Sequence, residues 1–234
     1  MPPKKTGGIE LGKIPFNGRS FEEYCAIFDI APEYLENKTV LDVAGGPSSF
    51  TAQARKYCRG SFACDPSYGR SADDLLKTGL DDIAEIREKI EPVLDMYKWD
   101  FYKSPDNLRV IRETTLKSFI ADYSSRAGRV KYVTGELPWL PFADNSFDLV
   151  LCSHFLFLFS GRLGYDFHLE SIKELARVSC GEVRVFPMVG LDTKPYAKMS
   201  ALLDDLEKAG IAIEIRKIAF EFQRGANRTL VAGR

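Results

Sequence analysis

The chain has 234 residues, of which 45% are hydrophobic and 28% are charged, and its formal net charge is −1. A chain of this length and composition can bury a core of its own, which excludes a disordered tail, a collagen and a coiled-coil rod. The 32 basic residues are matched by 33 acidic residues. Since nucleic-acid-binding proteins usually carry a basic surplus, we expect no nucleic acid partner.

The cysteine, histidine and apolar patterns indicate the cellular compartment of the protein. The five cysteines are an odd number, form no Cys-x-x-Cys pair and are accompanied by only two histidines. We therefore expect no metal site and a reducing compartment. The most apolar run, residues 149–159, is shorter than the roughly 20 residues that a membrane span needs. No apolar stretch follows the basic residues near the N-terminus, so we predict a cytoplasmic protein without a membrane partner.

Short apolar, β-rich runs alternate with helical patterns, which predicts a parallel sheet covered by helices on both faces. Two strand-like runs near the end, residues 211–222 and 228–232, are joined by a short turn and predict an antiparallel hairpin. The predicted fold class is therefore α/β: a Rossmann-like, doubly wound, mostly parallel sheet of seven strands with one antiparallel strand near the C-terminus. The other strands are expected at residues 39–43, 60–65, 129–134, 147–152 and 182–186, with helices at 48–57 and 167–178.

A segment of about sixty residues, 68–128, separates the second and third expected strands, and a simple crossover needs far fewer. Apolar residues at three- and four-residue intervals from Leu75 to Leu94 predict a helix, and a second helix is expected over residues 109–123. We interpret the segment as a helical insertion, or lid, packed on a single domain that spans residues 1–234. Four aromatic residues gather in it: Tyr97, Trp99, Phe101 and Tyr102.

The first expected strand runs into residues 44–47, a glycine turn before a helix, which is the arrangement that binds phosphates and nucleotides. A turn without bulky side chains lets a ligand approach the backbone closely. Dinucleotide-binding folds need Gly-x-Gly-x-x-Gly, but the matching positions are Ala44, Gly46 and Ser49. Asp42 would repel a pyrophosphate, whereas it suits a cationic group such as an ammonium. A nicotinamide-dependent oxidoreductase is therefore disfavoured.

Four motifs in order resemble those of the class I S-adenosylmethionine-dependent methyltransferases. Residues 41–47, Leu-Asp-Val-Ala-Gly-Gly-Pro, look like the first family motif, Asp65 closes the second strand, and Gly135-Glu136 follows the third. Residues 140–150, Leu-Pro-Phe-Ala-Asp-Asn-Ser-Phe-Asp-Leu-Val, are very close to the family's LPFxDxSFDLV approach to the fourth strand. The resemblance covers roughly residues 40–186 and the C-terminal hairpin, without the insertion.

This resemblance implies that the cofactor is S-adenosyl-L-methionine, with Asp65 on the ribose hydroxyls and Glu136 on the adenine amino group. Residues 16–24 resemble the helix that often covers the cofactor in this family, within an N-terminal helical cover of residues 1–37. Arg19 would meet the cofactor carboxylate and Tyr24 would shield it, with a surface or packing role as the alternative for both. The expected cofactor contacts are Arg19, Tyr24, Asp42, Ala44, Gly45, Gly46, Asp65, Pro66, Glu136, Leu137 and Ser153.

The sequence departs from the family pattern at three positions. Ala44 and Ser48 stand where the family usually has glycine, and Glu136 stands where aspartate is commoner. All three replacements keep the size or the charge close to the family's residue. We therefore expect the turn and the adenine contact to be kept.

The resemblance implies methyl transfer by in-line attack, which depends on alignment and exclusion of water more than on a dedicated set of acids and bases. His154 lies at the carboxyl end of the fourth strand, where an imidazole would take a proton from the acceptor. The alternative is a histidine that packs or positions the substrate. For His168 we expect a structural hydrogen bond at a helix N-terminus.

The methyl acceptor is the least defined element of the prediction. Residues 153–156, Ser-His-Phe-Leu, stand where family members that methylate amino groups of bases or of glutamine carry Asn/Asp-Pro-Pro-aromatic, so that substrate class is disfavoured. The balanced charge and the aromatic insertion favour a small, partly apolar acceptor beneath the 68–128 lid, contacted by Trp99 or Tyr102. The alternative is a cofactor-binding module of the same fold without catalytic activity. The sequence does not predict the oligomeric state.

Overall fold

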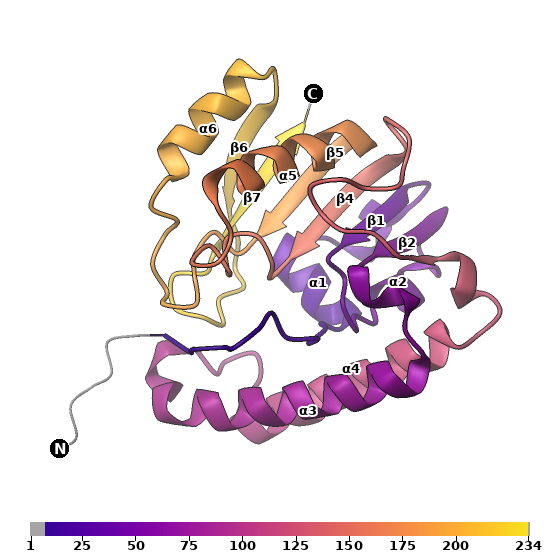
Figure 1. The fold of residues 1–234 in the computed structure, drawn as a ribbon, viewed down its shortest axis with the longest axis vertical. Coiled ribbons are helices and arrows are strands. Elements are labelled where there is room, and N and C mark those ends of the chain that lie inside the picture. The colour runs from indigo at the N-terminus through magenta and orange to yellow at the C-terminus, as the bar shows by residue number, and fades with distance from the viewer. Residues whose placement is uncertain (1–7, 234) are drawn as a thin grey trace.

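A seven-stranded sheet with the strand order β3-β2-β1-β4-β5-β7-β6 organises the chain (Figure 1). The computed structural model describes residues 8–233. The strand β7 runs antiparallel to both β5 and β6, whereas the other neighbouring strands are parallel. The predicted α/β sheet with one reversed strand is thus confirmed. The strands are β1 (Thr39–Val43), β2 (Gly60–Cys64), β3 (Tyr132–Val133), β4 (Phe147–Ser153), β5 (Ser179–Phe186), β6 (Ala212–Lys217) and β7 (Arg228–Gly233).

Six α-helices accompany this sheet within residues 8–233. They are α1 (Phe21–Phe28), α2 (Phe50–Ala54), α3 (Ala72–Ile90), α4 (Pro105–Tyr123), α5 (Tyr165–Val178) and α6 (Met199–Lys208). Short 3-10 helices occupy η1 (Pro32–Leu35), η2 (Pro66–Gly69), η3 (Glu91–Met96) and η4 (Gly128–Val130).

The central strands are buried on both faces because successive side chains point to opposite sides of the sheet. Leu41 and Val43 of β1 join one apolar cluster with α5 and α6. Val40 of β1, together with Leu149 and Leu151 of β4, joins a second cluster with α1 and α2. This two-sided burial explains why β1 and β4 read as nearly continuous apolar runs in the sequence.

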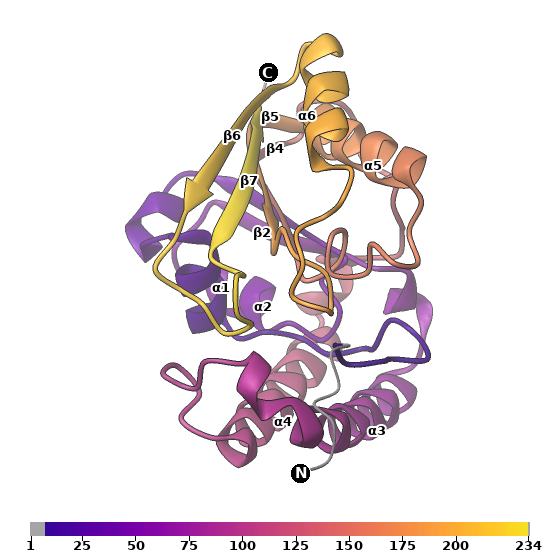
Figure 2. The same cartoon turned by 90° about the vertical axis from the view of Figure 1, so that its left-hand side faces the viewer.

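The helices α3 and α4 form a separate layer at one end of the molecule, and the N-terminal segment runs between this layer and the sheet (Figures 1 and 2). Asp82 of α3 fastens that segment. Its buried carboxylate accepts the amide hydrogen of Phe16 at 2.7 Å and lies 2.6 Å from the Lys13 ammonium. The N-terminal segment is therefore bound to the helical layer as well as to the sheet.

Several elements differ in length from those expected. The helix α2 spans only Phe50–Ala54, because residues 47–49 stay in the turn, where Ser48 Oγ accepts the amide hydrogen of Phe50 at 3.0 Å. The strand β3 is two residues long since η4 occupies the residues before it. Residues 16–20 are not helical, and α1 begins only at Phe21. The helix α6 was not predicted at all.

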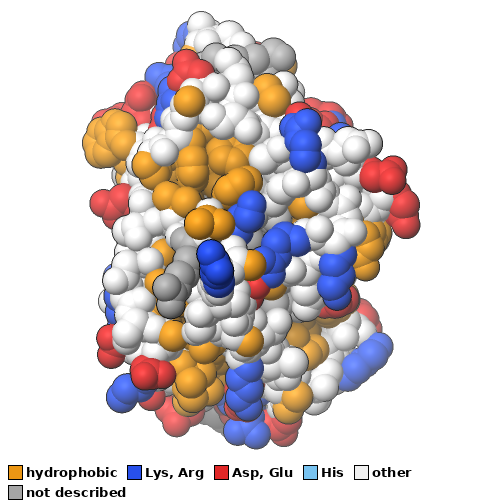
Figure 3. Space-filling model, turned by 90° about the vertical axis from the view of Figure 1, so that its right-hand side faces the viewer, with side chains coloured by type: hydrophobic (Ala, Val, Ile, Leu, Met, Phe, Trp, Pro, Cys, Tyr) orange, Lys and Arg blue, Asp and Glu red, His pale blue; other side chains and the backbone are white. Residues whose placement is uncertain are grey.

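No helix within residues 8–233 is both long and apolar enough to cross a membrane. The face on the right-hand side of Figure 1 carries Lys and Arg side chains that are interspersed with apolar patches and a few acidic residues (Figure 3). That side of the molecule thus presents mixed chemistry rather than one continuous basic surface.

Candidate active site

A cavity of about 470 Å³ lies at the carboxyl ends of β1, β2 and β4. Parallel α/β sheets bind their ligands at this edge, and the volume falls within the roughly 300–1,000 Å³ of ligand pockets. The N-terminal segment, the helices α3 and α4 and the loops that follow β3, β4, β5 and β6 provide further walls. The cavity therefore lies between the helical layer and the sheet.

The glycine turn after β1 forms the floor of the cavity, and its backbone is unusual. Ala44 and Gly46 both have positive φ angles, +53° and +49°. A Cβ on Gly45 would lie 2.9 Å from Asp42 Oδ2 and 3.0 Å from the Tyr68 hydroxyl, so this position has no room for a side chain. The backbone of the turn is thus left open to a ligand.

Asp65 holds this turn from the end of β2. Its Oδ2 accepts the amide hydrogen of Gly46 at 3.0 Å, and its Oδ1 accepts that of Ser67 at 2.9 Å. Burial raises the pKa of this carboxyl, while the Ser67 and Gly46 hydrogen bonds oppose the rise. Each carboxylate oxygen has more than one acceptor site, so Asp65 can bind hydroxyl groups of a ligand in addition.

The N-terminal segment lies directly on the same turn. The Arg19 carbonyl accepts the amide hydrogen of Ser49 at 3.1 Å, and a Cβ on Gly18 would lie 2.2 Å from backbone atoms of Pro47. Ser20 then begins α1 with a capping box, because its Oγ accepts the Glu23 amide hydrogen at 3.2 Å while its own amide donates to Glu23 Oε2 at 2.8 Å. This close fit places Arg19 at the cavity.

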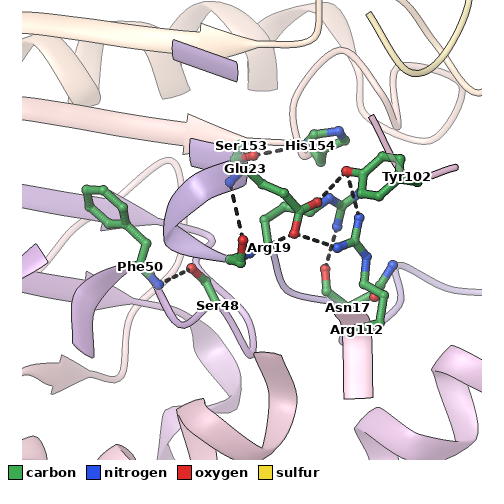
Figure 4. Close-up of polar contacts among 10 residues, drawn as sticks. Asn17, Arg19, Glu23, Ser48, Phe50, Tyr102, Arg112, Ser153 and His154 are labelled. Atoms are coloured by element: carbon green, nitrogen blue, oxygen red, sulfur yellow. Dashed lines mark hydrogen bonds and ion pairs between the residues drawn. The ribbon is translucent and has the colours of Figure 1, made fainter. Parts of the chain in front are cut away.

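A buried charged cluster joins α1 to α4 beside the cavity (Figure 4). Glu23 Oε2 lies 2.7 Å from Arg112 Nη1, and the two side chains are 0% and 6% exposed. The Tyr102 hydroxyl donates to Glu23 Oε1 and accepts a hydrogen bond from Arg112 Nη2 at 3.2 Å. Burial raises the pKa of Glu23, but Arg112 and then Arg19 outweigh burial, so the pKa lies below its usual value.

Arg19 adds a second guanidinium to this cluster. Its Nη1 donates to the Asn17 carbonyl at 2.7 Å, while its Nε and the Asn17 Oδ1 are buried without a hydrogen-bond partner in the described part of the chain. Burial, and next the charge of Arg112, lower the pKa of Arg19 to about 10, which leaves it charged at neutral pH. Since Arg112 already neutralises Glu23, the cluster carries an excess positive charge that suits an anionic ligand group.

Asp42 lies behind the turn, not in the cavity wall. Its Oδ1 accepts a hydrogen bond from the Tyr24 hydroxyl at 2.8 Å, and its Oδ2 has no partner within residues 8–233. Burial raises the pKa of Asp42 to about 8. The carboxyl is therefore mostly protonated at neutral pH.

The Asp42→Asn variant should change how stability depends on pH. Because the folded pKa of Asp42, about 8, lies above the ordinary aspartate value of 3.8, its contribution to stability is lost as pH rises toward 8. From pH 6 to pH 7.5 the free energy of unfolding of the wild type should therefore fall by about 2 kcal/mol relative to that of the variant, because asparagine does not titrate. Urea unfolding at both pH values measures this, with Asp148→Asn at the other end of the sheet as the control. Equal pH slopes for the wild type and Asp42→Asn would contradict the assignment.

His154 lies at the end of β4 with a φ of +54° and lines the cavity. Its amide donates to the Phe186 carbonyl at 2.6 Å, and its Nδ1 lies 2.8 Å from Ser153 Oγ (Figure 4). Burial, followed by the charges of Arg19 and Arg112, lowers its pKa well below 6.5. The ring is therefore neutral at neutral pH, and if Nδ1 donates to Ser153, Nε2 carries a free lone pair.

His168 does not line this cavity. Its ring nitrogens lie 2.7 Å from the carbonyl oxygen of Gly164, the N-cap of α5, and 3.1 Å from that of Leu156. The ring stacks between Phe157 and Tyr196. These contacts are structural, as the sequence led us to expect.

Most of the remaining wall of the cavity is apolar, and Arg87, Arg109 and Gln223 are its polar members. Of the four aromatic residues in the insertion only Tyr97 lines the cavity, because Tyr102 bonds to Glu23 and Trp99 packs on Phe222 instead. The expected contact of Trp99 or Tyr102 with an acceptor is thus not seen. The aromatic residues that line the cavity are Phe16, Tyr24, Tyr97, Phe155, Phe159, Phe167, Phe186, Phe220 and Phe222.

The structure brings most of the sequence-predicted site residues to this one cavity. Asp42 is the exception. Sequence reasoning missed Asn17 and Arg112, which also line the cavity, and Glu23, which holds Arg112. No group of three or more His, Cys, Asp or Glu side chains in residues 8–233 could hold a metal ion. The predicted residues that line the cavity are Arg19, Tyr24, Ala44, Gly45, Gly46, Asp65, Pro66, Glu136, Leu137, Ser153 and His154.

The reversed strand β7, the glycine turn and the cavity above it define the class of protein. A family model described as "Methyltransferase domain" matches residues 107–183. The chain belongs to the class I S-adenosylmethionine-dependent methyltransferases, enzymes whose cofactor is S-adenosyl-L-methionine.

The chain is similar to several individual proteins. "Uncharacterized protein MJ0045" of Methanocaldococcus jannaschii is 33% identical over 218 residues, which cover 93% of this chain and 95% of that protein. Among solved structures, the PH0226 protein of Pyrococcus horikoshii has a TM-score of 0.47 at 13% identity, covering 90% of this chain and 89% of that one. Magnesium protoporphyrin IX methyltransferase of Synechocystis, solved with bound S-adenosylmethionine, has a TM-score of 0.45 at 14% identity, covering 90% and 76%.

Proposed function

We propose that this enzyme methylates a small, partly apolar acceptor bound between the glycine turn and the helical layer. The observation that supports it most is the composition of a single cavity wall. Apart from Asp42, the residues expected to hold the cofactor line the same space as the imidazole of His154 and a largely aromatic surface. A methyl donor and an apolar acceptor would therefore meet beside His154.

The residues present fit the cofactor at both of its ends. Arg19 and Asn17 have buried polar atoms without partners, and they would bind the carboxylate and ammonium of the amino-acid end. Asp65 would bind the ribose hydroxyls, and the exposed Glu136 would bind the adenine amino group. Asp42 would act through Tyr24, whose hydroxyl it orients. The cofactor supplies a methyl group on a positively charged sulfur, which needs no further activation.

The chain's own residues would align the acceptor and keep water away. The neutral His154 would take the acceptor proton at Nε2, while Ser153 fixes the ring through Nδ1. The insertion of residues 68–128 and the N-terminal cover would close the cavity, since α3, α4 and residues 9–19 line it.

Calorimetric titration with S-adenosylmethionine, S-adenosylhomocysteine and NAD(H) tests the cofactor site. We expect binding of the two adenosyl ligands and none of NAD(H). A methyl-transfer assay against a panel of metabolites then tests the acceptor class. Exclusive turnover of large or fully polar acceptors would overturn the proposal.

The Asp65→Asn variant should weaken S-adenosylhomocysteine binding about 30-fold, equivalent to about 2 kcal/mol for lost charge-assisted hydrogen bonds. The asparagine retains one acceptor oxygen for the turn but removes the charge. Asp144→Asn is the matched control, because Asp144 pairs with Arg177 on the surface and does not line the cavity. Equal affinities for Asp65→Asn and the wild type would remove Asp65 from the site.

A further inference from the structure

A second, more open cavity of about 1090 Å³ adjoins the first. Both are lined by the same six apolar residues: Ile9, Leu11, Leu158, Phe159, Leu163 and Leu191. The two spaces are therefore an inner and an outer compartment separated by a shared apolar wall. A ligand longer than the inner compartment would extend over that wall into the outer one.

Each compartment is lined by four cationic residues and two carboxylates, but the cations differ in how far the protein neutralises them. In the described part of the chain, the only carboxylates that line the inner compartment are Asp65 and Glu136, both assigned above to the cofactor. The two acidic residues of the outer compartment are Glu10 and Asp192. The cationic residues of the outer compartment are Lys89, Arg162, Lys194 and Lys198.

Two of these cations are not neutralised by the protein. Lys89 pairs with Glu85 at 2.6 Å and Lys194 lies 3.8 Å from Asp192. Arg162 donates instead to the carbonyl of Leu11, and the Lys198 ammonium lies 5.5 Å from the centre of the Tyr165 ring. Neither has a carboxylate within 4.0 Å among residues 8–233. Both charges are available to an anionic group of a ligand.

We infer that the methyl acceptor is an amphipathic anion, with an apolar body in the inner compartment and a carboxylate or phosphate group held by Arg162 and Lys198. The inference rests on the proposed function for the place of the reacting atom beside His154. The proposed function leaves the charge of the acceptor open, and the two cations define it as anionic. The apolar wall would bind the apolar body of the acceptor, and Arg162 and Lys198 would bind its anionic group.

Two fluorescent probes that differ by one sulfonate test this inference. 8-Anilinonaphthalene-1-sulfonate is anionic, and N-phenyl-1-naphthylamine has the same ring system without the charge. For the Arg162→Gln/Lys198→Gln variant we expect the dissociation constant of the anionic probe to rise about tenfold, with less than a twofold change for the neutral one. The control is Lys173→Gln/Lys208→Gln, which removes two exposed cations of α5 and α6 that line neither cavity.

Displacement of the neutral probe from the wild type then identifies the anion. Decanoate and decyl phosphate should compete better than decanol, and whichever of the two anions loses more affinity in the double variant is the group that is recognised. Equal competition by decanol, or an equal loss in the control variant, would overturn the inference. Measurements with and without saturating S-adenosylhomocysteine separate the two proposals. If that ligand does not bind, the proposed function fails while the anion result stands independently.

Discussion

Replacement of Arg112 by methionine is expected to lower the free energy of unfolding by about 3–5 kcal/mol, the typical cost of leaving a buried charge without its partner. Glu23 is fully buried, and its Oε2 lies 2.7 Å from the guanidinium that the substitution removes. The Tyr102 hydroxyl would also lose a hydrogen-bond donor. Urea unfolding at neutral pH measures the loss.

Two further variants separate the ion pair from the general effect of a substitution in α4. Arg109→Met lies on the same helix, but that guanidinium is half exposed and 3.9 Å from Glu113, so we expect a change below about 0.5 kcal/mol. Glu23→Gln combined with Arg112→Met should recover part of the loss, because no unpaired charge is then buried. An Arg112→Met variant as stable as Arg109→Met would show that the pair contributes nothing.

The same pair connects the helical layer to the cofactor end of the cavity. Glu23 also accepts the amide hydrogen of Ser20, the residue that follows Arg19. Loss of Arg112 would thus loosen the start of α1 and the position of the Arg19 guanidinium. We expect the insertion to influence cofactor binding by this route although most of it lies far from the turn.

The sequence predicted the sheet well because its central strands are buried on both faces. Such strands need continuous apolar runs, and β1 and β4 have them. The positions of these strands therefore follow from the pattern of apolar residues alone. The short helix α6 was missed because only two of its residues, Leu202 and Leu206, are buried. The true start of α1 was readable in principle, since Ser20 and Glu23 have the spacing of a capping box.

The site was predictable only where it follows strand ends. The turn of residues 44–46, Asp65 and His154 come directly after strands, so their convergence follows from the fold class. Arg112 could not be found in this way, because its partner Glu23 lies 89 residues away in the sequence. The one local signal is an arginine on the buried stripe of α4, beside Leu108 and Leu116. That pattern indicates a buried charge pair but does not name the partner.

For Asp42, the sequence predicted the position on the strand but not the direction of the side chain. The sequence places it correctly at the end of β1, next to the glycine turn. Whether its side chain reaches the cavity depends on which face of the strand it occupies and on what packs there. Tyr24 of α1 bonds to it from behind the turn, so the carboxyl contacts the cavity-lining Tyr24 and not the cavity itself. Only the packing of α1 against the sheet decides this.

The His154→Asn variant is expected to lose about 100-fold or more in kcat, the usual contribution of a positioned general base. Asparagine tolerates the φ of +54° and keeps a hydrogen-bonding group for Ser153, so the fold and the ring's surroundings should survive. S-adenosylhomocysteine affinity should change less than twofold, since the proposed cofactor contacts lie on other residues. The split between kcat and cofactor affinity distinguishes a base from a packing residue.

The pH dependence gives an independent measurement of the same group. Since burial and the charges of Arg19 and Arg112 lower the pKa of His154 well below 6.5, the base is already deprotonated at neutral pH. With an acceptor from the metabolite panel, the rate of the wild type should stay level from pH 8 down to 6.5 and fall only under more acidic conditions. In NMR, the ring-proton resonance of His154 should titrate in that acidic range. A resonance that titrates near 6.5, or an unchanged kcat in His154→Asn, would remove His154 from the proton transfer and leave alignment as the enzyme's main contribution.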